Sequence, residues 1–279
     1  MHTTAAAPHT ELIYRHALIV RITHWFNALC LLVLLMSGLQ IFNAHATLYW
    51  GSKSEPDRAI LSMRAVQRDD GSYAGITTIG SKSFDTTGVL GLSGSGENVE
   101  SRGFPAWITL PSYRDLATGR RWHFAFAWLF VLNGLAYLLY TLLSGHARRD
   151  LAPTRDELSH IGESISEHAR FHFPKGEEAK HYNVLQKLAY LAVIFGLLPL
   201  AILSGLTMSP ALDAVFPFLL DLFGGRQSAR TVHFLCATGI VLFVFVHVFM
   251  VLVSGLWNNL RSMITGRYAI ETAEDGHAR

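Results

Sequence analysis

Four histidines lie within or at the start of long apolar segments, and these residues have the type and position to do chemistry. The run HFLCATGIVLFVFVH begins at His233 and ends at His247, while His24 and His123 each stand near the start of another apolar run. An ionisable side chain is costly inside a membrane and by default marks a functional site. The chemistry open to a neutral imidazole there is ligation of a metal centre.

The spacing of His233 and His247 predicts two separate centres. At about 100° per residue, fourteen residues fall about 40° short of four turns, so both histidines share one helix face about 21 Å apart. That distance is too long for one metal ion, but it suits two cofactors stacked across a membrane. Sorting the histidines by depth pairs His123 with His233 in an outer layer and His24 with His247 in an inner layer.

Two imidazoles from facing helices in an apolar bundle are the axial ligands typical of haem. Closing both axial positions of the iron favours electron transfer over oxygen binding. Zinc is excluded because it needs three or four ligands in one place, and each layer offers two histidines. The alternative is a haem-free transporter or sensor with hydrogen-bonded histidines. The apolar runs contain no Asp or Glu, which argues against a proton-coupled carrier.

The elements that position these histidines are predicted from hydropathy. The chain has 279 residues, half of them hydrophobic, with a mean hydropathy above that of ordinary soluble domains. We predict an all-α integral membrane protein, a four-transmembrane-helix bundle that binds two b-type haems. A span in lipid must satisfy its own backbone hydrogen bonds, which requires a helix. The runs long enough to cross the bilayer are 18–42, 122–143, 188–208 and 231–257.

Cysteine use and net charge exclude several other classes. The two cysteines lie in separate apolar runs and form no CxxC or CxxCH motif. This excludes an iron–sulfur domain, a zinc ribbon and covalently attached haem. The formal net charge is only +2, so the sequence gives no reason to expect nucleic acid as a partner.

Two polar segments separate the first three spans of the predicted domain 18–257. The insert 43–121 is long for a loop and is predicted to form a small ordered extracytoplasmic cap, with a turn at DDGSY; a flexible linker is the alternative. In the loop 144–187, the segment from Thr154 to Glu157 fits a capping box that opens a short amphipathic helix on the membrane surface.

The distribution of basic residues predicts the orientation of the spans. It places the tails 1–17 and 258–279 and the loop 144–187 in the cytoplasm of a bacterium, so the protein is a multi-pass inner-membrane protein. The cytoplasmic side holds Arg15, Arg21, Arg148, Arg149, Lys180, Lys187, Arg261 and Arg267, while the short outer loop holds Arg226 and Arg230. Arg120 and Arg121, at the outer end of the second span, run against the rule.

Glycines and arginines near the histidines are candidates for the haem environment. Gly38 lies fourteen residues beyond His24 on the same face, where the first span should pass the outer haem. Gly134, Gly196, Gly205 and Gly239 could act likewise, and ordinary helix packing is the alternative for each. Haem propionates need cations, which the arginines could supply; interfacial anchoring is their alternative role. The candidate arginines are Arg120, Arg121 and Arg230 in the outer layer and Arg21 in the inner layer.

The segments RITHWFNA (21–28), GRRWHFAFAW (119–128) and YNVLQKLAY (182–190), together with SGL (204–206), carry a family resemblance. They resemble the dihaem cytochrome b subunits of formate dehydrogenase, nickel–iron hydrogenase and thiosulfate reductase, a family to which the bacterial cytochrome b561 group is close. The resemblance covers all four spans. It implies the same histidine pairs that depth implied. It also implies a quinone pocket beside the inner haem.

The resemblance assigns the quinone pocket to the segment that enters the third span. Asn183 and Gln186 are then the candidate quinone ligands, although both are also plausible as plain helix-cap residues. Leu185 stands where the family often has glycine, which is a departure from the family's pocket. The insert is another departure, and it looks more like cytochromes b that accompany molybdopterin oxidoreductases of the sulfite oxidase or thiosulfate reductase type.

We therefore expect an electron-transfer subunit rather than a catalytic subunit on its own. It would pass electrons between the quinone pool, near the inner haem, and a periplasmic redox partner such as a molybdopterin oxidoreductase, near the outer haem. One alternative is a free-standing enzyme of the cytochrome b561 type, a quinol-linked superoxide or ferric oxidoreductase. The other is the haem-free transporter or sensor. The sequence does not give the direction of electron flow.

Overall fold

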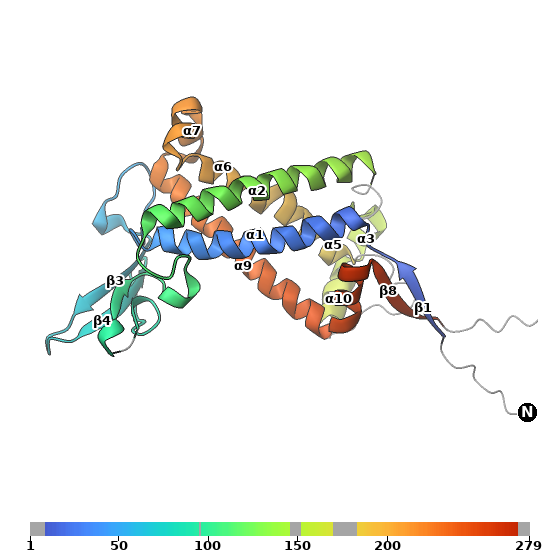
Figure 1. Ribbon diagram of the computed structural model, residues 1–279, viewed down its shortest axis with the longest axis horizontal. Helices are drawn as coiled ribbons and strands as arrows, with labels where there is room; N and C mark the ends of the chain where they lie inside the picture. The colour runs from blue at the N-terminus through green and yellow to red at the C-terminus, as the bar shows by residue number, and fades with distance from the viewer. Residues whose placement is uncertain (1–8, 95, 146–151, 170–182, 273–279) are drawn as a thin grey trace, which may run out of the picture. The chain divides into compact units, whose positions relative to one another are not determined.

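The computed structural model describes residues 9–94, 96–145, 152–169 and 183–272, and Figure 1 shows their helices and strands. Three of the basic residues used for the orientation, Arg148, Arg149 and Lys180, lie outside these ranges. The chain divides into two compact units. Unit 1 comprises Met1–Trp25, Gly134–Gly196 and Val241–Arg279, and unit 2 comprises Phe26–Asn133 and Leu197–Ile240.

Four helices are long and apolar enough to cross a membrane, as the hydropathy predicted. They are α1 (Leu18–Phe42), α2 (Leu116–Leu143), the helix Val184–Leu206 and α9 (Arg226–Val253). The helix Val184–Leu206 consists of α5 (Val184–Ala192), a π-helical turn η6 (Val193–Leu197) and α6 (Leu198–Leu206). Pro199 near the start of α6 has no N–H for an α-helical bond, and the wider π turn before it accommodates that loss.

Several helix ends differ from the hydropathy boundaries by a few residues, and in two of them a single residue sets the end. α2 begins at Leu116, before the predicted 122, since the Asp115 carboxylate accepts from the Thr118 backbone N–H at 3.0 Å as an N-cap. α9 ends at Val253, before the predicted 257. Gly255 follows with φ +112°, a left-handed conformation that favours glycine, and the separate helix α10 (Leu256–Thr265) begins there.

The insert between α1 and α2 is an ordered β structure, so the flexible-linker alternative is not what the structure shows. Four strands form an antiparallel sheet in chain order, and a further hairpin accompanies it. Gly75 lets this hairpin lie close to the sheet, since a Cβ there would come within 2.3 Å of the Leu90 carbonyl oxygen. The sheet contains β2 (Thr47–Leu48), β3 (Leu61–Gln67), β4 (Tyr73–Ile79) and β5 (Lys82–Asp85), and the hairpin contains β6 (Gly91–Ser93) and β7 (Glu100–Arg102).

The turn predicted at DDGSY joins β3 to β4. The Arg68 backbone N–H donates to the Ser72 carbonyl at 2.8 Å, and the Asp70 carboxylate accepts from the Ser72 N–H at 2.9 Å. The second bond is an Asx turn, which is the local structure that this polar sequence favours.

The insert is fixed to the ends of α1 and α9 within unit 2. Phe42 at the end of α1 packs against Phe104 of the insert and Phe234 of α9, with ring centres 5.7 and 4.9 Å apart. Arg102, which is 3% exposed, donates to the Gln40 side-chain oxygen and to the Thr109 hydroxyl, each at 2.9 Å. Apolar packing and a buried guanidinium therefore hold the cap.

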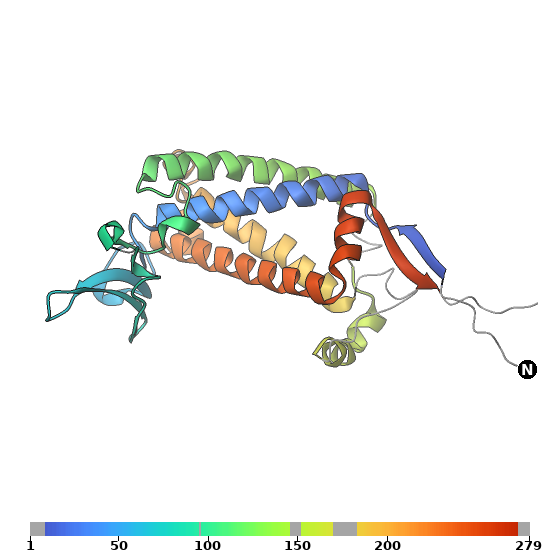
Figure 2. The same cartoon turned by 60° about the horizontal axis from the view of Figure 1, so that its bottom comes forward.

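Unit 1 contains structure that the sequence analysis did not assign to the two tails. β1 (His9–Tyr14) pairs antiparallel with β8 (Arg267–Thr272), as Figure 2 shows. The loop before α5 contains α3 (Arg155–Ser159) and α4 (Ile161–Ala169), and the predicted capping box of Thr154 and Glu157 is present at the start of α3.

Candidate functional site

The outer pair of histidines lies within unit 2. The rings of His123 on α2 and His233 on α9 have centres 6.2 Å apart and planes at 70°. His123 Nδ1 lies 3.2 Å from the Leu34 carbonyl oxygen, and His233 Nδ1 lies 2.8 Å from the Ala201 carbonyl oxygen. Since a carbonyl oxygen only accepts, each Nδ1 carries the hydrogen. Each Nε2 is therefore the nitrogen available to a metal.

The inner pair lies within unit 1. The rings of His24 on α1 and His247 on α9 also have centres 6.2 Å apart, with planes at 58°. Phe243, one turn before His247, stacks on its ring at 5.9 Å and 16°. Nδ1 of His24 is buried and has no hydrogen-bond partner among the described residues. The two pairs thus share their ring spacing but differ in what holds the rings.

The ring spacing fits one metal between each pair of imidazoles. A metal–imidazole bond is about 2 Å long and a ring centre lies about 1 Å behind its nitrogen, so imidazoles that share one metal have centres about 6 Å apart. Among the described residues, no three His, Cys, Asp or Glu side chains gather as a metal site. A bare ion would lack ligands at either pair. Haem supplies its own four equatorial nitrogens, so the residues present fit haem.

Two glycines lie against the outer histidines. A Cβ on Gly38 would lie 3.3 Å from His123 Cε1, and one on Gly205 would lie 3.2 Å from His233 Cε1. Gly38 thus lies against the ring of His123, and its place beside an outer haem stays a prediction. At Gly239 a Cβ would meet the Leu197 side chain at 3.3 Å, which is ordinary helix packing. At Gly134 and Gly196 it would meet no described atom within 4 Å.

The candidate arginines have unequal surroundings. Arg230 donates to the carbonyls of His45 and Thr47, the latter at 2.9 Å, so its guanidinium holds the start of the insert. Arg120 is exposed and lies over the Phe124 ring at 5.6 Å, and Arg121 is exposed as well. The role of these two arginines toward haem propionates stays a prediction.

In unit 1, Arg21 donates to the Ile264 carbonyl at 2.5 Å, which ties α1 to α10, and its Nε is buried without a described partner. Trp25 makes a parallel contact, since its Nε1–H donates to the Met263 carbonyl at 3.1 Å. Close to Arg230, in unit 2, burial and the nearby guanidinium charge lower the pKa of His45, which favours the neutral form of that imidazole.

The candidate quinone residues form the start of α5. The Asn183 side-chain oxygen accepts from the Leu185 N–H at 2.9 Å, and the Gln186 side-chain oxygen accepts from the Asn183 N–H at 3.3 Å. This is a complete capping box, so the structural role proposed as their alternative is present. It uses the two oxygens and none of the side-chain N–H donors.

An ion pair between a buried lysine and a half-buried glutamate lies directly beside this capping box. Lys187 is 6% exposed, and its Nζ lies 2.8 and 3.1 Å from the two carboxylate oxygens of Glu157. Burial raises the pKa of Glu157, but the hydrogen bonds from Lys187 and Thr154 outweigh it, so the pKa lies below its usual value. The sequence analysis used Lys187 only for orientation. No sequence signal joined it to Glu157, because the pairing spans thirty residues.

Sequence reasoning also missed Arg102 and the two serines next to Gly38 and Gly205. Arg102 lies in a short strand with no motif around it, so nothing marked it. The serines had a weak signal, since SGL occurs at 37–39, at 204–206 and once more at 254–256. Both serines are fully buried.

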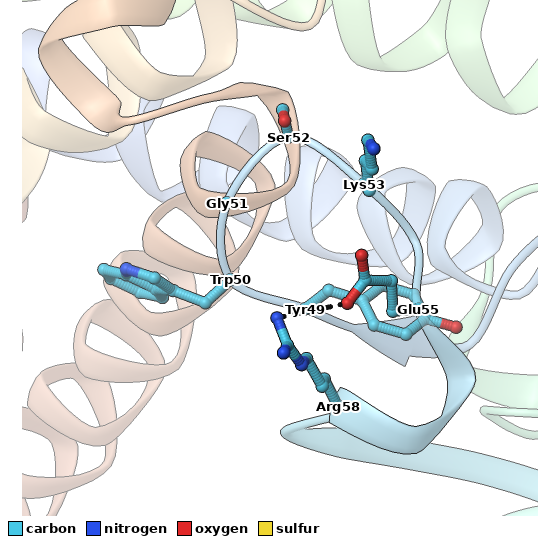
Figure 3. A pocket seen from close by; sticks show the side chains of 7 residues that line it. All are labelled: Tyr49, Trp50, Gly51, Ser52, Lys53, Glu55 and Arg58. Carbon is cyan, nitrogen blue, oxygen red and sulfur yellow. Dashed lines mark ion pairs between the residues drawn. The ribbon is translucent and has the colours of Figure 1, made fainter.

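One further hollow lies in the insert, where the chain turns from Tyr49 to Arg58 (Figure 3). Lys53, Glu55 and Arg58 line it, and Glu55 pairs with Arg58 at 3.3 Å. The Arg58 side chain is 82% exposed. An exposed ion pair of this kind is worth little, and the hollow indicates no ligand class.

Comparisons with known proteins give the family of this chain. The family described as prokaryotic cytochrome b561 matches residues 15–266. The chain is similar to a protein of Azospira oryzae named putative protein-methionine-sulfoxide reductase subunit YedZ1. The two are 37% identical over 153 residues, which cover 53% of this chain and 70% of that relative. No solved structure matches the chain.

Proposed function

The chain belongs to the prokaryotic cytochrome b561 family, and we propose that within it this protein is a two-haem wire between a quinone and a redox partner across the membrane. As a member of that family it is a membrane haem protein of electron transfer. Family membership excludes the haem-free transporter or sensor. The number of haems, their ligands, the quinone and the partner are the proposal.

The observation that carries the proposal is the equal ring spacing of two separate histidine pairs. Both pairs stand at 6.2 Å between ring centres. We assign His24 and His247 to an inner haem, and His123 and His233 to an outer one. All four side chains project from apolar helices, where an imidazole without a partner group would be costly.

The protein contributes ligation, position and electrostatics to this chemistry. A bound haem supplies the redox centre, which exchanges one electron. The four histidines would hold the iron of the two haems, two to each, and such ligation would favour electron transfer over oxygen binding. The helix carbonyls of Leu34 and Ala201 hold Nδ1–H of the outer ligands, which fixes the tautomer and the ring orientation.

We place the quinone beside the inner pair, at the start of α5. Within unit 1, Tyr190 of α5 lies 6.3 Å from the Phe243 ring, which stacks on His247. Asn183 and Gln186 keep side-chain N–H donors that their capping box does not use, and such donors suit a quinone carbonyl. The orientation that places both termini in the cytoplasm puts this end on the cytoplasmic side.

We place the partner at the insert, on the periplasmic side. The insert is ordered, and it exposes Trp107 at 79% and Trp50 at 63%, a residue type that protein interfaces favour. The relative in Azospira oryzae is named as a subunit of a putative reductase, which supports a role for this chain in a complex. A molybdopterin oxidoreductase remains the proposed partner.

The test is haem stoichiometry with a reduced-minus-oxidised visible spectrum. The purified protein is expected to hold two b-type haems, and His247→Ala and His24→Ala should each lose one and the same haem. His233→Ala and His123→Ala should lose the other. His45→Ala is the matched control, since His45 is an outer histidine that belongs to neither pair, and it should keep both haems.

The pairs are tested by the double variants. His24→Ala with His247→Ala should still hold one haem, whereas His24→Ala with His233→Ala should hold none. A wild-type protein with a single haem would overturn the two-haem proposal. Two haems with crossed losses would mean that the pairing is wrong.

A further inference from the structure

The tripeptide Ser-Gly-Leu occurs in α1 at 37–39, in α6 at 204–206 and again at 254–256, between α9 and α10. Each of the first two copies lies against one histidine of the outer pair, and both contacts fall inside unit 2, whereas a Cβ on Gly255 of the third copy would meet no described atom within 4 Å. The first two copies are on different helices, far apart in sequence, and they hold histidines from two further helices. The same Ser-Gly pair therefore contacts a histidine ring in two different helices.

In the first copy, the Ser37 hydroxyl donates to the Val33 carbonyl at 2.6 Å. Its single hydrogen is then used, so its lone pair faces His123 Nδ1 at 3.1 Å as an acceptor. The Leu34 carbonyl accepts from the same Nδ1–H at 3.2 Å. Gly38 provides the space, since a Cβ there would press on the ring at 3.3 Å.

The second copy repeats this arrangement residue for residue. The Ser204 hydroxyl donates to the Leu200 carbonyl at 2.6 Å and lies 3.4 Å from His233 Nδ1. The Ala201 carbonyl, three residues before the serine as Leu34 is before Ser37, accepts from Nδ1–H at 2.8 Å. Gly205 again leaves room for the ring.

A hydrogen bond from the non-ligating nitrogen makes an imidazole a more basic ligand. A more basic ligand favours the oxidised iron, and hydrogen bonds at the ligands are one of the ways in which proteins set haem potentials. Both outer histidines have two acceptors at Nδ1. In the inner pair, His24 Nδ1 has none among the described residues.

We propose that Ser37-Gly38 and Ser204-Gly205 form a duplicated clamp that positions the two outer ligands and holds the outer haem at a lower reduction potential than the inner haem. This inference rests on the two-haem assignment above. The four residues are positioning residues, since they act through His123 and His233. A reductive titration should therefore reduce the inner haem before the outer one.

The experiment is a spectroelectrochemical titration of the detergent-purified protein, with low-spin ferric electron paramagnetic resonance as a second readout. The variants are Ser37→Ala, Ser204→Ala and the double variant. Thr238→Val is the matched control, because the Thr238 hydroxyl makes the same bond to the carbonyl four residues earlier, at 2.9 Å, on an exposed face of α9.

At a fixed applied potential, each single variant should raise the ratio of reduced to oxidised outer haem about threefold, because one of two acceptors is lost. The double variant should raise it about tenfold, which is about 59 mV for a one-electron couple. The inner haem and the Thr238→Val protein should not shift. Ser37→Cys keeps most of the volume but offers a weak acceptor, so it should follow Ser37→Ala.

The outcomes separate the clamp from the proposed function. If the protein holds two haems but the outer potential stays fixed, or Ser37→Cys behaves as wild type, the clamp is overturned and the two-haem wire stands. If the outer haem of the wild type is reduced before the inner one, the clamp is overturned as well. If the wild type holds a single haem, both proposals fail together, since the clamp then has no second site to contrast with.

Discussion

Adding one methyl group at Gly205 should loosen the outer haem, and the structure gives the size of the effect. The Cβ of Gly205→Ala would stand 3.2 Å from His233 Cε1, whereas carbon atoms in contact prefer about 3.5–4.0 Å. The ring must therefore retreat by roughly 0.3 Å or more. The contact of Nδ1 with the Ser204 hydroxyl, already 3.4 Å, would then exceed hydrogen-bonding distance.

Two opposing energies decide the outcome of Gly205→Ala. Alanine gains about 1 kcal/mol over glycine in a helix interior, while overpacking a filled site costs about 1–3 kcal/mol. The matched control is Gly162→Ala in α4, where an added Cβ would meet no described atom within 4 Å and the helix gain stands alone. Relative to the control, Gly205→Ala should therefore weaken the binding of the outer haem by about 1–3 kcal/mol, which is the overpacking cost.

The assay is the rate at which an excess of haem-scavenging apoprotein removes haem, followed in the Soret band. A deficit of about 1.4 kcal/mol is a tenfold change, so the outer haem of Gly205→Ala should leave about ten times faster than that of Gly162→Ala. The inner haem should leave at the unchanged rate. Equal rates for both proteins would refute the reasoning that Gly205 exists to admit the imidazole.

Two further predictions concern charged side chains, the first Glu157 with Lys187 and the second Arg102. Because the pKa of Glu157 lies below its usual value, its contribution to stability is present at neutral pH and is lost as pH falls through the lowered pKa. Lys187→Met should move that acid loss to higher pH, as measured by the unfolding midpoint against pH. Arg102→Met should loosen the insert and speed its limited proteolysis, since it leaves the buried Gln40 and Thr109 oxygens without this donor, at about 1–3 kcal/mol each. Arg68→Met removes the exposed ion pair with Asp85, which contributes no more than about 1 kcal/mol to stability, so the proteolysis rate should stay close to that of the wild type. A proteolysis rate equal for these two variants would contradict the role given to Arg102.

The membrane helices could be predicted because their signal is local. Length and hydropathy alone locate four spans, and a capping residue or a glycine then moves each end by a few positions, as Asp115 and Gly255 do. The juxtaposition of His123 with His233 followed from counting turns and depth. These arguments need only the helix repeat and the thickness of a bilayer.

The insert could not be predicted in the same way, because its order depends on contacts between distant residues. β2 has two residues, and its pairing with β3 has no signature in the sequence. The role of Arg230 depends on carbonyls more than 180 positions earlier in the chain. The charge of Arg230 suggested a haem propionate as its partner. Charge alone does not predict that the guanidinium donates its hydrogen bonds to backbone carbonyl oxygens.

The two histidine pairs show what is left for a protein to vary once the ligands are the same. In the two-haem assignment that we propose, each haem would have two imidazoles, so ligand identity would set no difference between the centres and hydrogen bonding and burial would remain. The outer rings are held by carbonyls and serine hydroxyls, while at the inner pair Phe243 stacks on His247 and His24 Nδ1 has no described partner. An electron has a preferred position in a chain of two redox centres only if the reduction potentials of the centres differ. We propose that in this chain the difference between the two centres comes from the groups that contact the ligands, namely Ser37-Gly38 in α1 and Ser204-Gly205 in α6.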